Sequence, residues 1–556
     1  MSIISSARSF IRRVRADGVA CIPEMVHTRL MTLIHRDVLR REAATRKAEE
    51  DAYQAFIARH TQPDPTPFAT QLTLSFLIPT YNTRPEHLAA LADSLLAQSC
   101  PRWEACLYDG ASPDPATREA LAALGQRDPR FRVLMGTENG GISGNTNAAF
   151  AMAAGDVIAL CDHDDLLAPD AVRCILEAVQ DGADFIYTDE DKVTADGTRF
   201  FEPHLKPDFA PDSLRAGNYI CHITAMARPL AEALVRRDGC LLRSAFDGSQ
   251  DHDLALRATE LAAKIVHIPR ILYHWRMLDT SFSHQKAERC VQAACSAVRD
   301  QLTRLRLPGE VAMESLRVRI RYAVPTVSVS AIVWGEGRVP RLPGEVIRVS
   351  DPAEFNAAAR RATGEYLLFL HAGMEPLDKA WLDELLMHAA RGGVGCVGSA
   401  ILDRQRFYRH AGYAVDVPGG AVSHHAGQWL YGRPYMITDR LVRNVTGVSS
   451  GLLLIRRELF LQLGGFGEYE SDLRGADLGL RCLQAGLVSV YTPHARMVMR
   501  IRNSESGIRN LICERFPAED IRRFRAAWGE HPQERYHSPL FTPDGRMTVD
   551  FTREAR

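Results

Sequence analysis

Four short apolar runs alternate with segments of helical spacing between residues 72 and 161. The runs cover residues 72–79, 105–108, 131–135 and 157–161, and the helical segments between them cover 87–98, 117–124 and 145–154. This alternation predicts the α/β class, with a mostly parallel sheet between layers of helices. Three runs lead directly into polar residues: Thr80-Tyr81-Asn82, Asp109, and Asp162-His163-Asp164-Asp165. Since such sheets bind ligands at the carboxyl ends of their strands, we expect a site there.

The pattern starts again at Val327. VSVSAIVW is similar to LSFLIPTY, GEYLLFLHAG to GDVIALCDHDD, and ADLGLRC to HDLALRA. A chain of 556 residues is too long for one core, so this similarity predicts a second domain of the same architecture. We expect a helical N-terminal extension and linker over 1–66, a first α/β domain over 67–320, a degenerate and shortened copy over 321–505, and a helical tail over 506–556.

The overall charge is almost balanced. A formal net charge of -1 gives no field that would steer the chain to nucleic acid, so we expect no nucleic-acid partner. The 12 cysteines form no C-x-x-C pair and no zinc pattern with histidine, which favours reduced thiols in the cytoplasm. No apolar run is long enough to span a bilayer and no signal peptide is visible, so we expect a cytoplasmic protein.

An amphipathic helix is predicted near the N-terminus. Phe10, Ile11 and Val14 share one face, close to four arginines. This pattern suits a helix lying on the inner face of the cytoplasmic membrane, as a peripheral contact. It equally suits a helix packed on the first domain, and amphipathicity alone does not separate the two.

The sharpest polar feature is the run CDHDDLLAP, which places Asp162, Asp164 and Asp165 directly after an apolar strand. Like charges so close together are costly unless a cation offsets them. Carboxylate oxygens suit Mg²⁺ or Mn²⁺, which also bind substrate phosphates. The alternative is an acidic helix cap, but capping explains one of the three acids.

Two further segments carry ionisable groups. In GSQDHDLALR, Asp251 lies in the first turn of a helix, where it serves either as a general base or as a carboxylate stabilised by the helix dipole. In LYHWR, His274 and Arg276 follow an apolar strand, where a cation would offset the charge of an anionic ligand. The alternative there is a surface Arg and a His packed beside Trp275. The run YTDED adds three acids, which either order a wall for the second substrate or form a solvated loop.

Taken together, these motifs resemble family 2 glycosyltransferases, especially the large two-domain bacterial type of O-antigen, rhamnan and capsular polysaccharide assembly. The resemblance extends from residue 70 to residue 505. Its segments, in order, are PTYNT, WEACLYDGASPDP, NGGISGNTNAA, CDHDDLLAPD, IYTDEDK, KPDF, NYICH, GSQDHDLALR and HIPRILYHWR.

The resemblance implies a GT-A fold and a metal-dependent, inverting transfer of sugar from a nucleotide-sugar donor. The acceptor would be a growing polysaccharide or a lipid-linked glycan. By position, the donor site would comprise Thr80, Tyr81, Asp109, Asn147, Asp162, His274 and Arg276. Asp162 and Asp164 would hold Mg²⁺ or Mn²⁺, and Asp251 would take the proton from the acceptor hydroxyl. Gly110 departs from the pattern, because the family often has a second acid there.

Other functions remain open from the residues alone. One is a non-catalytic carbohydrate-binding or assembly scaffold, and another is a metal-dependent phosphohydrolase or glycoside hydrolase with paired carboxylates. For the second domain we expect no transfer activity. His371-Ala372-Gly373 stands where the first domain has Asp162-His163-Asp164, and Gly475 stands at the position of Asp251. His410, Asn444 and Thr446 would either line an acceptor groove or be buried polar groups.

Overall fold

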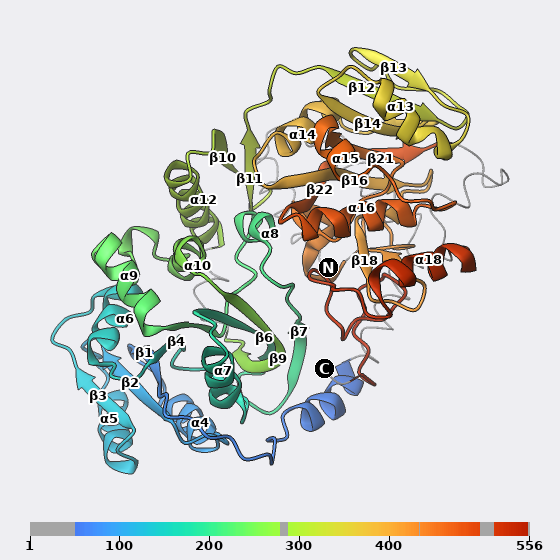
Figure 1. Ribbon diagram of the computed structural model, residues 1–556. Helices are drawn as coiled ribbons and strands as arrows, with labels where there is room; N and C mark the ends of the chain where they lie inside the picture. Colours follow the sequence, from blue (N-terminus) through green and yellow to red (C-terminus); the bar gives the residue numbers. More distant parts are fainter. Residues whose placement is uncertain (1–49, 279–286, 433, 501–515, 554–556) are drawn as a thin grey trace, which may run out of the picture. The chain divides into compact units, whose positions relative to one another are not determined.

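The computed structural model describes residues 50–278, 287–432, 434–500 and 516–553 (Figure 1). The chain divides into two compact units. The first unit comprises Met1–Phe209, Gly217–Ile320 and Phe551–Arg556, and the second comprises Ala210–Ala216 and Arg321–Asp550. The helix predicted around Phe10 lies outside the described residues. Within them, no helix has the length and apolar character needed to cross a membrane.

The first unit is built on a nine-stranded sheet in the order β3-β2-β1-β4-β8-β6-β9-β5, with β7 paired to β6. Its strands are β1 (Leu74–Thr80), β2 (Trp103–Asp109), β3 (Phe131–Met135), β4 (Val157–Leu160), β5 (Leu166–Leu167), β6 (Phe185–Val193), β7 (Phe200–His204), β8 (Thr224–Ala227) and β9 (Ile265–Arg276). The predicted α/β class is confirmed. β3, β2, β1 and β4 are mutually parallel, so their carboxyl ends share one edge, whereas β8 runs antiparallel to β4.

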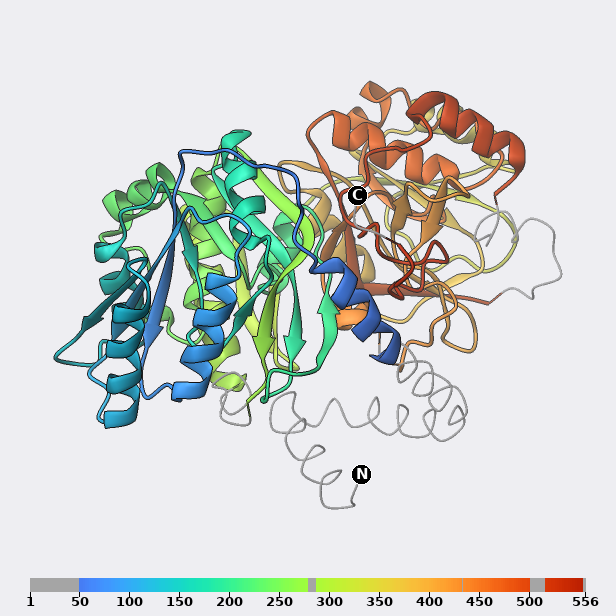
Figure 2. The ribbon, with the colours of Figure 1, turned by 90° about the horizontal axis from the view of Figure 1, so that it is seen from below.

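Helices cover both faces of this sheet (Figures 1 and 2). They are α4 (Pro85–Leu96), α5 (Pro115–Arg127), α6 (Gly141–Met152), α7 (Ala171–Gln180), α9 (Arg228–Asp238), α10 (Gln250–Leu261) and α12 (Ala287–Arg304). Leu88 of α4, Leu121 of α5 and Ile175 of α7 share one core with the buried strands, as their helical spacing requires. Residues 50–60 are also helical, and Tyr53 and Phe56 of this segment are buried.

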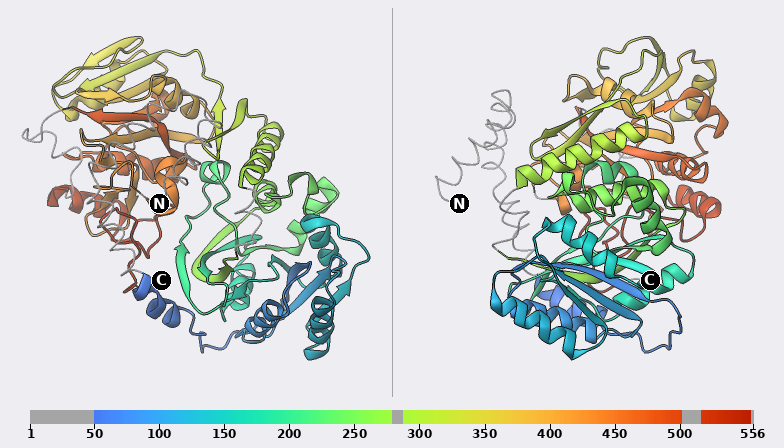
Figure 3. Two further views of the ribbon diagram at one scale, coloured as in Figure 1. Left: turned by 180° about the vertical axis from the view of Figure 1, so that it is seen from behind. Right: turned by 90° about the vertical axis from the view of Figure 1, so that its left-hand side faces the viewer.

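Most of the second unit is coloured from yellow to red in Figure 3. It has a nine-stranded sheet in the order β13-β12-β14-β21-β16-β22-β15, with β17 on β16 and β20 on β22. Its strands are β12 (Val329–Trp334), β13 (Glu345–Arg348), β14 (Tyr366–His371), β15 (Met374–Pro376), β16 (Val394–Leu402), β17 (Tyr408–His410), β20 (Arg443–Val445), β21 (Leu452–Arg456) and β22 (Val488–Met499). Two further two-stranded sheets pair β10 (Gly309–Glu314) with β11 (Arg317–Tyr322), and β18 (Tyr413–Val415) with β19 (Ala421–Ser423).

The two large sheets share their strand order and strand directions, except that β3 of the first unit and β20 of the second have no counterpart. A buried serine contact is also repeated. Ser75 Oγ donates to Glu104 Oε1 at 2.7 Å and accepts from the Gly155 amide at 2.8 Å. In the second unit Ser330 bonds Glu345 and accepts from the Gly364 amide at 2.8 Å. The expected internal duplication, and the shortening of the copy, are therefore present in the fold.

The helices of the second unit are shorter on average. They are α8 (Pro211–Ala216), α13 (Phe355–Arg361), α14 (Trp381–Ala389), α15 (Arg457–Gln462), α16 (Leu473–Gln484) and α18 (Ala518–Trp528). The tail expected to be helical contains α18, but its later described residues form turns and an isolated bridge between Phe541 and Val549 instead.

Candidate functional site

The acidic turn after β4 is fixed to β9 by one of its three carboxylates. Asp165 is fully buried, and its oxygens accept hydrogen bonds from the Tyr273 hydroxyl (2.5 Å) and the Arg276 amide (2.7 Å). Burial, followed by repulsion from Asp164 and Asp162, raises the pKa of Asp165 well above its usual range. Asp165 therefore shapes the turn, and its two oxygens already have donors.

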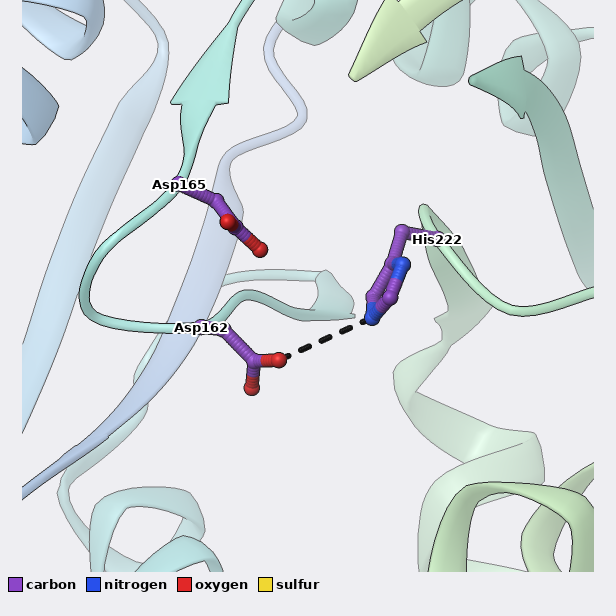
Figure 4. Close-up of side chains that lie close together, drawn as sticks. All are labelled: Asp162, Asp165 and His222. Carbon is purple, nitrogen blue, oxygen red and sulfur yellow. Dashed lines mark ion pairs between the residues drawn. The ribbon is translucent and has the colours of Figure 1, made fainter. Parts of the chain in front are cut away.

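The other two acids are more accessible. The side chains of Asp162 and Asp164 are 41% and 23% exposed. Asp164 Oδ1 lies 3.8 Å from His163 Nδ1, and Asp162 Oδ2 lies 3.6 Å from His222 Nε2. Asp162, Asp165 and His222 place three possible ligand atoms within 4.8 Å of one another in the described part of the chain (Figure 4). Asp164 is not in this group, so its predicted role as a metal ligand stays a prediction.

His222 connects the acidic turn to a buried carboxylate. Its Nδ1 lies 3.1 Å from Glu190 Oε2, and its amide donates to the same oxygen at 2.9 Å. The Lys206 ammonium lies 3.3 Å from that oxygen and donates to the carbonyls of Ile220 and His222. Burial alone would lower the pKa of His222, but its bonds to Asp162 and Glu190 raise it well above the usual value. A cationic His222 then offsets part of the charge of the turn.

The three acids of the YTDED run lie in β6 and are all buried, so they do not form a solvated loop. Each has a histidine partner. The pairs are Asp189 with His267 (2.9 Å), Glu190 with His204 and His222 (both 3.1 Å), and Asp191 with His274 (2.5 Å). The sequence singled out the acids and His274 but not their pairing. It gave His204, His222 and His267 no role, because these partners come from β7, β9 and the loop before β8.

β9 supplies the two basic residues predicted for the donor site. His274 is held through Nδ1 by Asp191, whose other oxygen accepts from the Tyr53 hydroxyl at 2.5 Å. Arg276 Nε donates to the Asp164 carbonyl at 2.6 Å and Nη1 to the Ala195 carbonyl at 3.0 Å. Its Nη2 is buried and has no hydrogen-bond partner among the described residues. An unpaired buried N–H is unfavourable by about 1–3 kcal/mol, and an anionic ligand beside the turn would remove that penalty.

The ends of β1 and β2 are joined side by side. Thr80 pairs with Asp109 in the sheet, and its hydroxyl donates to the Tyr108 carbonyl at 3.1 Å. Asp109 accepts from the amide (2.8 Å) and the hydroxyl (2.5 Å) of Ser112, which fixes the loop after β2. Tyr81 is 43% exposed at the same edge. The structure therefore brings Thr80, Tyr81 and Asp109 together, and their contact with a base stays a prediction.

Two residues of α6 explain details of this edge. Both polar atoms of the Asn147 amide bond the backbone of Leu242, at 2.8 and 2.9 Å, so the structure shows Asn147 as a tie between α6 and that loop. A donor contact by Asn147 is not tested by these bonds. A Cβ on Gly110 would lie 2.4 Å from Asn145 Nδ2, which accounts for the absence of the second acid there.

Asp251 lies in the first turn of α10, as predicted. Its Oδ2 accepts from Asn218 Nδ2 at 2.8 Å. Asn218 and His222 belong to the same short segment, NYICH. This segment touches the predicted base, Asp251, at one end and the acidic turn, through Asp162, at the other. The sequence offered NYICH only as part of the family resemblance and gave neither residue a role.

In the second unit, the residues considered for an acceptor groove are buried polar groups. His410 Nε2 accepts from the amides of Gly412 (3.1 Å) and Ser449 (2.9 Å). Thr446 donates to Glu534 at 2.8 Å. Asn444 bonds Asp212, and all three side chains are at most 2% exposed. Their contacts support the second of the two interpretations.

Residues 75–238 match the family model for glycosyl transferase family 2. The chain therefore contains a glycosyltransferase family 2 domain. The match includes the acidic turn and NYICH and ends before Asp251, His274 and Arg276.

Relatives of this family 2 protein extend the similarity into the second unit. It is 32% identical over 492 residues to the uncharacterized protein y4gI of Sinorhizobium fredii, covering 76% of this chain and 52% of the relative. It is 32% identical over 481 residues to the O-antigen biosynthesis protein RfbC of Myxococcus xanthus, covering 76% of this chain and 37% of that one. The chain thus spans about half or less of the length of these relatives.

One solved structure is also similar to part of this chain. The structure of residues 1–349 of S. aureus TarS in complex with UDP-GlcNAc matches with a TM-score of 0.34 and 16% identity. It covers 42% of this chain and 66% of that one.

Proposed function

We propose that this protein is a metal-dependent, inverting glycosyltransferase that moves a sugar from a nucleotide-sugar donor to a growing cell-surface polysaccharide or lipid-linked glycan. The family 2 match and the relative named for O-antigen biosynthesis support the class of reaction. The observation that carries the proposal is the unpaired Nη2 of buried Arg276, which lies on the strand directly bonded to an acidic turn with two accessible carboxylates.

The residues of the turn fit a divalent cation. Asp162 and Asp164 offer hard carboxylate oxygens. Asp165 fixes the turn to β9 through its hydrogen bonds with Tyr273 and Arg276. Asp162 and Asp164 would hold Mg²⁺ or Mn²⁺, with His222 beside Asp162. A cation bound there supplies charge compensation for the diphosphate of the donor.

The chain's own groups perform the remaining steps. Arg276 Nη2 donates to the diphosphate and stabilises the negative charge that grows on it as the bond to the sugar breaks. Asp251 accepts the proton of the acceptor hydroxyl, whose oxygen attacks the anomeric carbon from the side opposite the leaving diphosphate, which inverts the configuration. Asn218 orients Asp251. Thr80, Tyr81 and Asp109 bind the base, and Asn147 and His274 complete the donor site.

The experiment is a donor panel with the full chain. Release of nucleoside diphosphate is measured with each nucleotide sugar, with and without glycan acceptors, in Mg²⁺, Mn²⁺ or chelator, and the anomeric configuration of the product is read by NMR. We expect release that requires both metal and acceptor, and an inverted product. Glycan binding without any release would favour the scaffold alternative, and acceptor-independent cleavage in water would favour a hydrolase.

The proposed location is the inner face of the cytoplasmic membrane, because a lipid-linked acceptor is found there. The predicted amphipathic helix around Phe10 would make the contact, as a peripheral one. Removal of residues 1–20 should then abolish binding to vesicles that contain anionic lipid. Unchanged vesicle binding would contradict this location.

A further inference from the structure

α8 is a segment of the first half of the chain that folds as part of the second unit. The chain leaves the first unit after Phe209, forms this single helix, and rejoins the first unit at Gly217. The next residues are those of NYICH, which begins at Asn218. The segment that touches Asp251 and Asp162 therefore starts directly where α8 ends.

α8 is held in the second unit by a buried carboxylate. Asp212 Oδ1 pairs with Arg391 Nη1 at 2.5 Å, and Asp212 Oδ2 accepts from Asn444 Nδ2 at 2.9 Å. The amide of Asp212 donates to Asn444 Oδ1, also at 2.9 Å. The backbone N–H of Asn444 donates to Ser213 Oγ at 3.3 Å. Both Oδ1 and Nδ2 of Asn444 therefore form hydrogen bonds with α8.

The charges at this contact are matched. Asp212 is 4% exposed, and the Arg391 guanidinium packs over the ring of Tyr322 at 4.5 Å. Burial alone would raise the pKa of Asp212, but Arg391 and then Arg215 hold it well below the usual range. Removing one member of a buried pair leaves an uncompensated charge, so this contact is sensitive to single substitutions.

α8 itself has only six residues, too few to be stable as an isolated helix. The joint that follows it is a glycine with open space around it, since a Cβ on Gly217 would meet no atom within 4 Å. Packing at Gly217 therefore does not set the direction of the chain toward Asn218. Upstream of this joint, Asp212 is the buried charged group that ties α8 to distant residues of the second unit.

We propose that Asp212 is a positioning residue for the transfer reaction. By binding Arg391 and Asn444, it fixes α8 in the second unit and thereby the course of NYICH, which orients Asp251 through Asn218 and Asp162 through His222. The second unit then serves the reaction as an anchor, although its own copy of the acidic turn lacks the acids. The effect on transfer rests on the proposed function, whereas the effect on the order of NYICH does not.

The test uses the full chain with Asp212→Asn and, from the other side of the contact, Arg391→Met. Hydrogen exchange of the amides of residues 217–222 is measured together with kcat for transfer and the affinity for nucleoside diphosphate. We expect exchange at these amides to accelerate at least tenfold and kcat to fall at least tenfold. The affinity for nucleoside diphosphate should fall less than kcat, because Asp164 and Arg276 have no contact with NYICH among the described bonds.

The matched control is Arg481→Met. It breaks the Asp477–Arg481 pair (2.6 Å) of α16 in the same unit, which does not involve α8. This variant should lower the melting temperature while leaving exchange at 217–222 and kcat unchanged. Arg391→Lys keeps the positive charge, so it should accelerate exchange and lower kcat less than Arg391→Met does. If Asp212→Asn does not fold, the comparison of these two Arg391 variants takes its place.

Two results would overturn the proposal. One is wild-type exchange at 217–222 in a folded Asp212→Asn or Arg391 variant. The other is the same acceleration in Arg481→Met, which would show a general loosening of the second unit. If wild type transfers no sugar but the exchange pattern is as expected, the anchor stands and the proposed function fails.

Discussion

Asn218 donates a hydrogen bond of 2.8 Å from its side-chain amide to the Asp251 carboxylate. A neutral amide donor orients a carboxylate without adding a charge, and the carboxylate keeps lone pairs for another donor. These are the properties that a general base for an acceptor hydroxyl needs.

Asp251→Asn should reduce transfer by about a hundredfold or more, because an amide cannot take the proton. Donor binding should be unchanged, since the proposed role of Asp251 is to take the proton of the acceptor. The check is kcat for transfer beside the dissociation constant of the nucleotide sugar by calorimetry. Unchanged activity per folded molecule would leave Asp251 as a helix-start residue stabilised by the helix dipole.

Asp164→Ala should abolish transfer and raise the metal concentration needed for donor binding, with little loss of stability. The reason is that the Asp164 carboxylate is partly exposed, and His163 Nδ1 lies 3.8 Å from it, too far for a hydrogen bond. Asp165→Ala is the contrast, because it strips the Tyr273 hydroxyl and the Arg276 amide of their acceptor, at about 1–3 kcal/mol each. Melting temperatures and metal titrations of both variants separate the two roles. Full activity of Asp164→Ala at limiting metal would remove it from the metal site.

The strands and the acidic turn could be predicted because their signals are local. An apolar run ending in Asp162-His163-Asp164-Asp165 needs no distant partner to be recognised. The burial of Asp189, Glu190 and Asp191 could not be predicted, since three adjacent acids are typical of a solvent-exposed loop. Partners from other elements, such as His267 of β9, make their burial tolerable, and the pairing depends on strand register.

The assignment of α8 to the second unit could not be predicted from the sequence either. Nothing in the sequence PDSLRA marks it as part of another unit. Asp212 meets Arg391 and Asn444, which lie 179 and 232 positions away along the chain. The duplication itself was visible because similar core strands leave similar apolar runs in both halves.

Stability of the second unit should depend on the titration of Glu534. Burial raises the pKa of Glu534 from 4.5 to about 7, although the Val415 and Tyr536 amides and the Thr446 hydroxyl donate to it. The folded state then keeps the proton up to about pH 7, whereas the unfolded chain loses it near 4.5. The stability contributed by this group is therefore lost as pH rises between these values.

The measurement is the melting temperature of wild type and Glu534→Gln from pH 4.5 to pH 8. Relative to the variant, wild type should lose stability across this range and level off above about pH 7. Glu530→Gln, at a glutamate that is 69% exposed, is the control and should follow wild type. Parallel curves for wild type and Glu534→Gln would show that folding does not raise the pKa of Glu534.

Gly475→Ala should destabilise the second unit. A Cβ at Gly475 would lie 2.2 Å from the Val448 carbonyl oxygen, which is backbone and cannot move aside alone. Such overpacking is unfavourable by about 1–3 kcal/mol. Gly392→Ala is the control, because a Cβ there meets no atom within 4 Å. Equal unfolding free energies for the two variants would show that the backbone at Val448 moves away from the new Cβ at little energetic cost.

The full-length double variant Asp164→Ala, Asp251→Asn should show no transfer above the uncatalysed background, because we expect the second unit to have no site of its own. His371 lies the same number of residues after Gly364 as Asp162 lies after Gly155. It is buried against Trp334 (4.5 Å between ring centres), and burial lowers its pKa to about 4, so it is neutral at pH 7. A buried neutral imidazole is a poor replacement for a carboxylate around Mg²⁺.

The base position of the second unit is closed as well. The pair of Asp253 and Arg257 in α10 is repeated by Asp477 and Arg481 in α16, which aligns Gly475 with Asp251. The Val448 carbonyl occupies the place of any side chain at Gly475, so packing has been kept where the reactive group is missing. Prolonged incubation of the double variant with every donor that wild type accepts is the decisive assay. Metal-dependent release of nucleoside diphosphate that survives in it, and is lost on adding His371→Ala, would place a second working site in this unit.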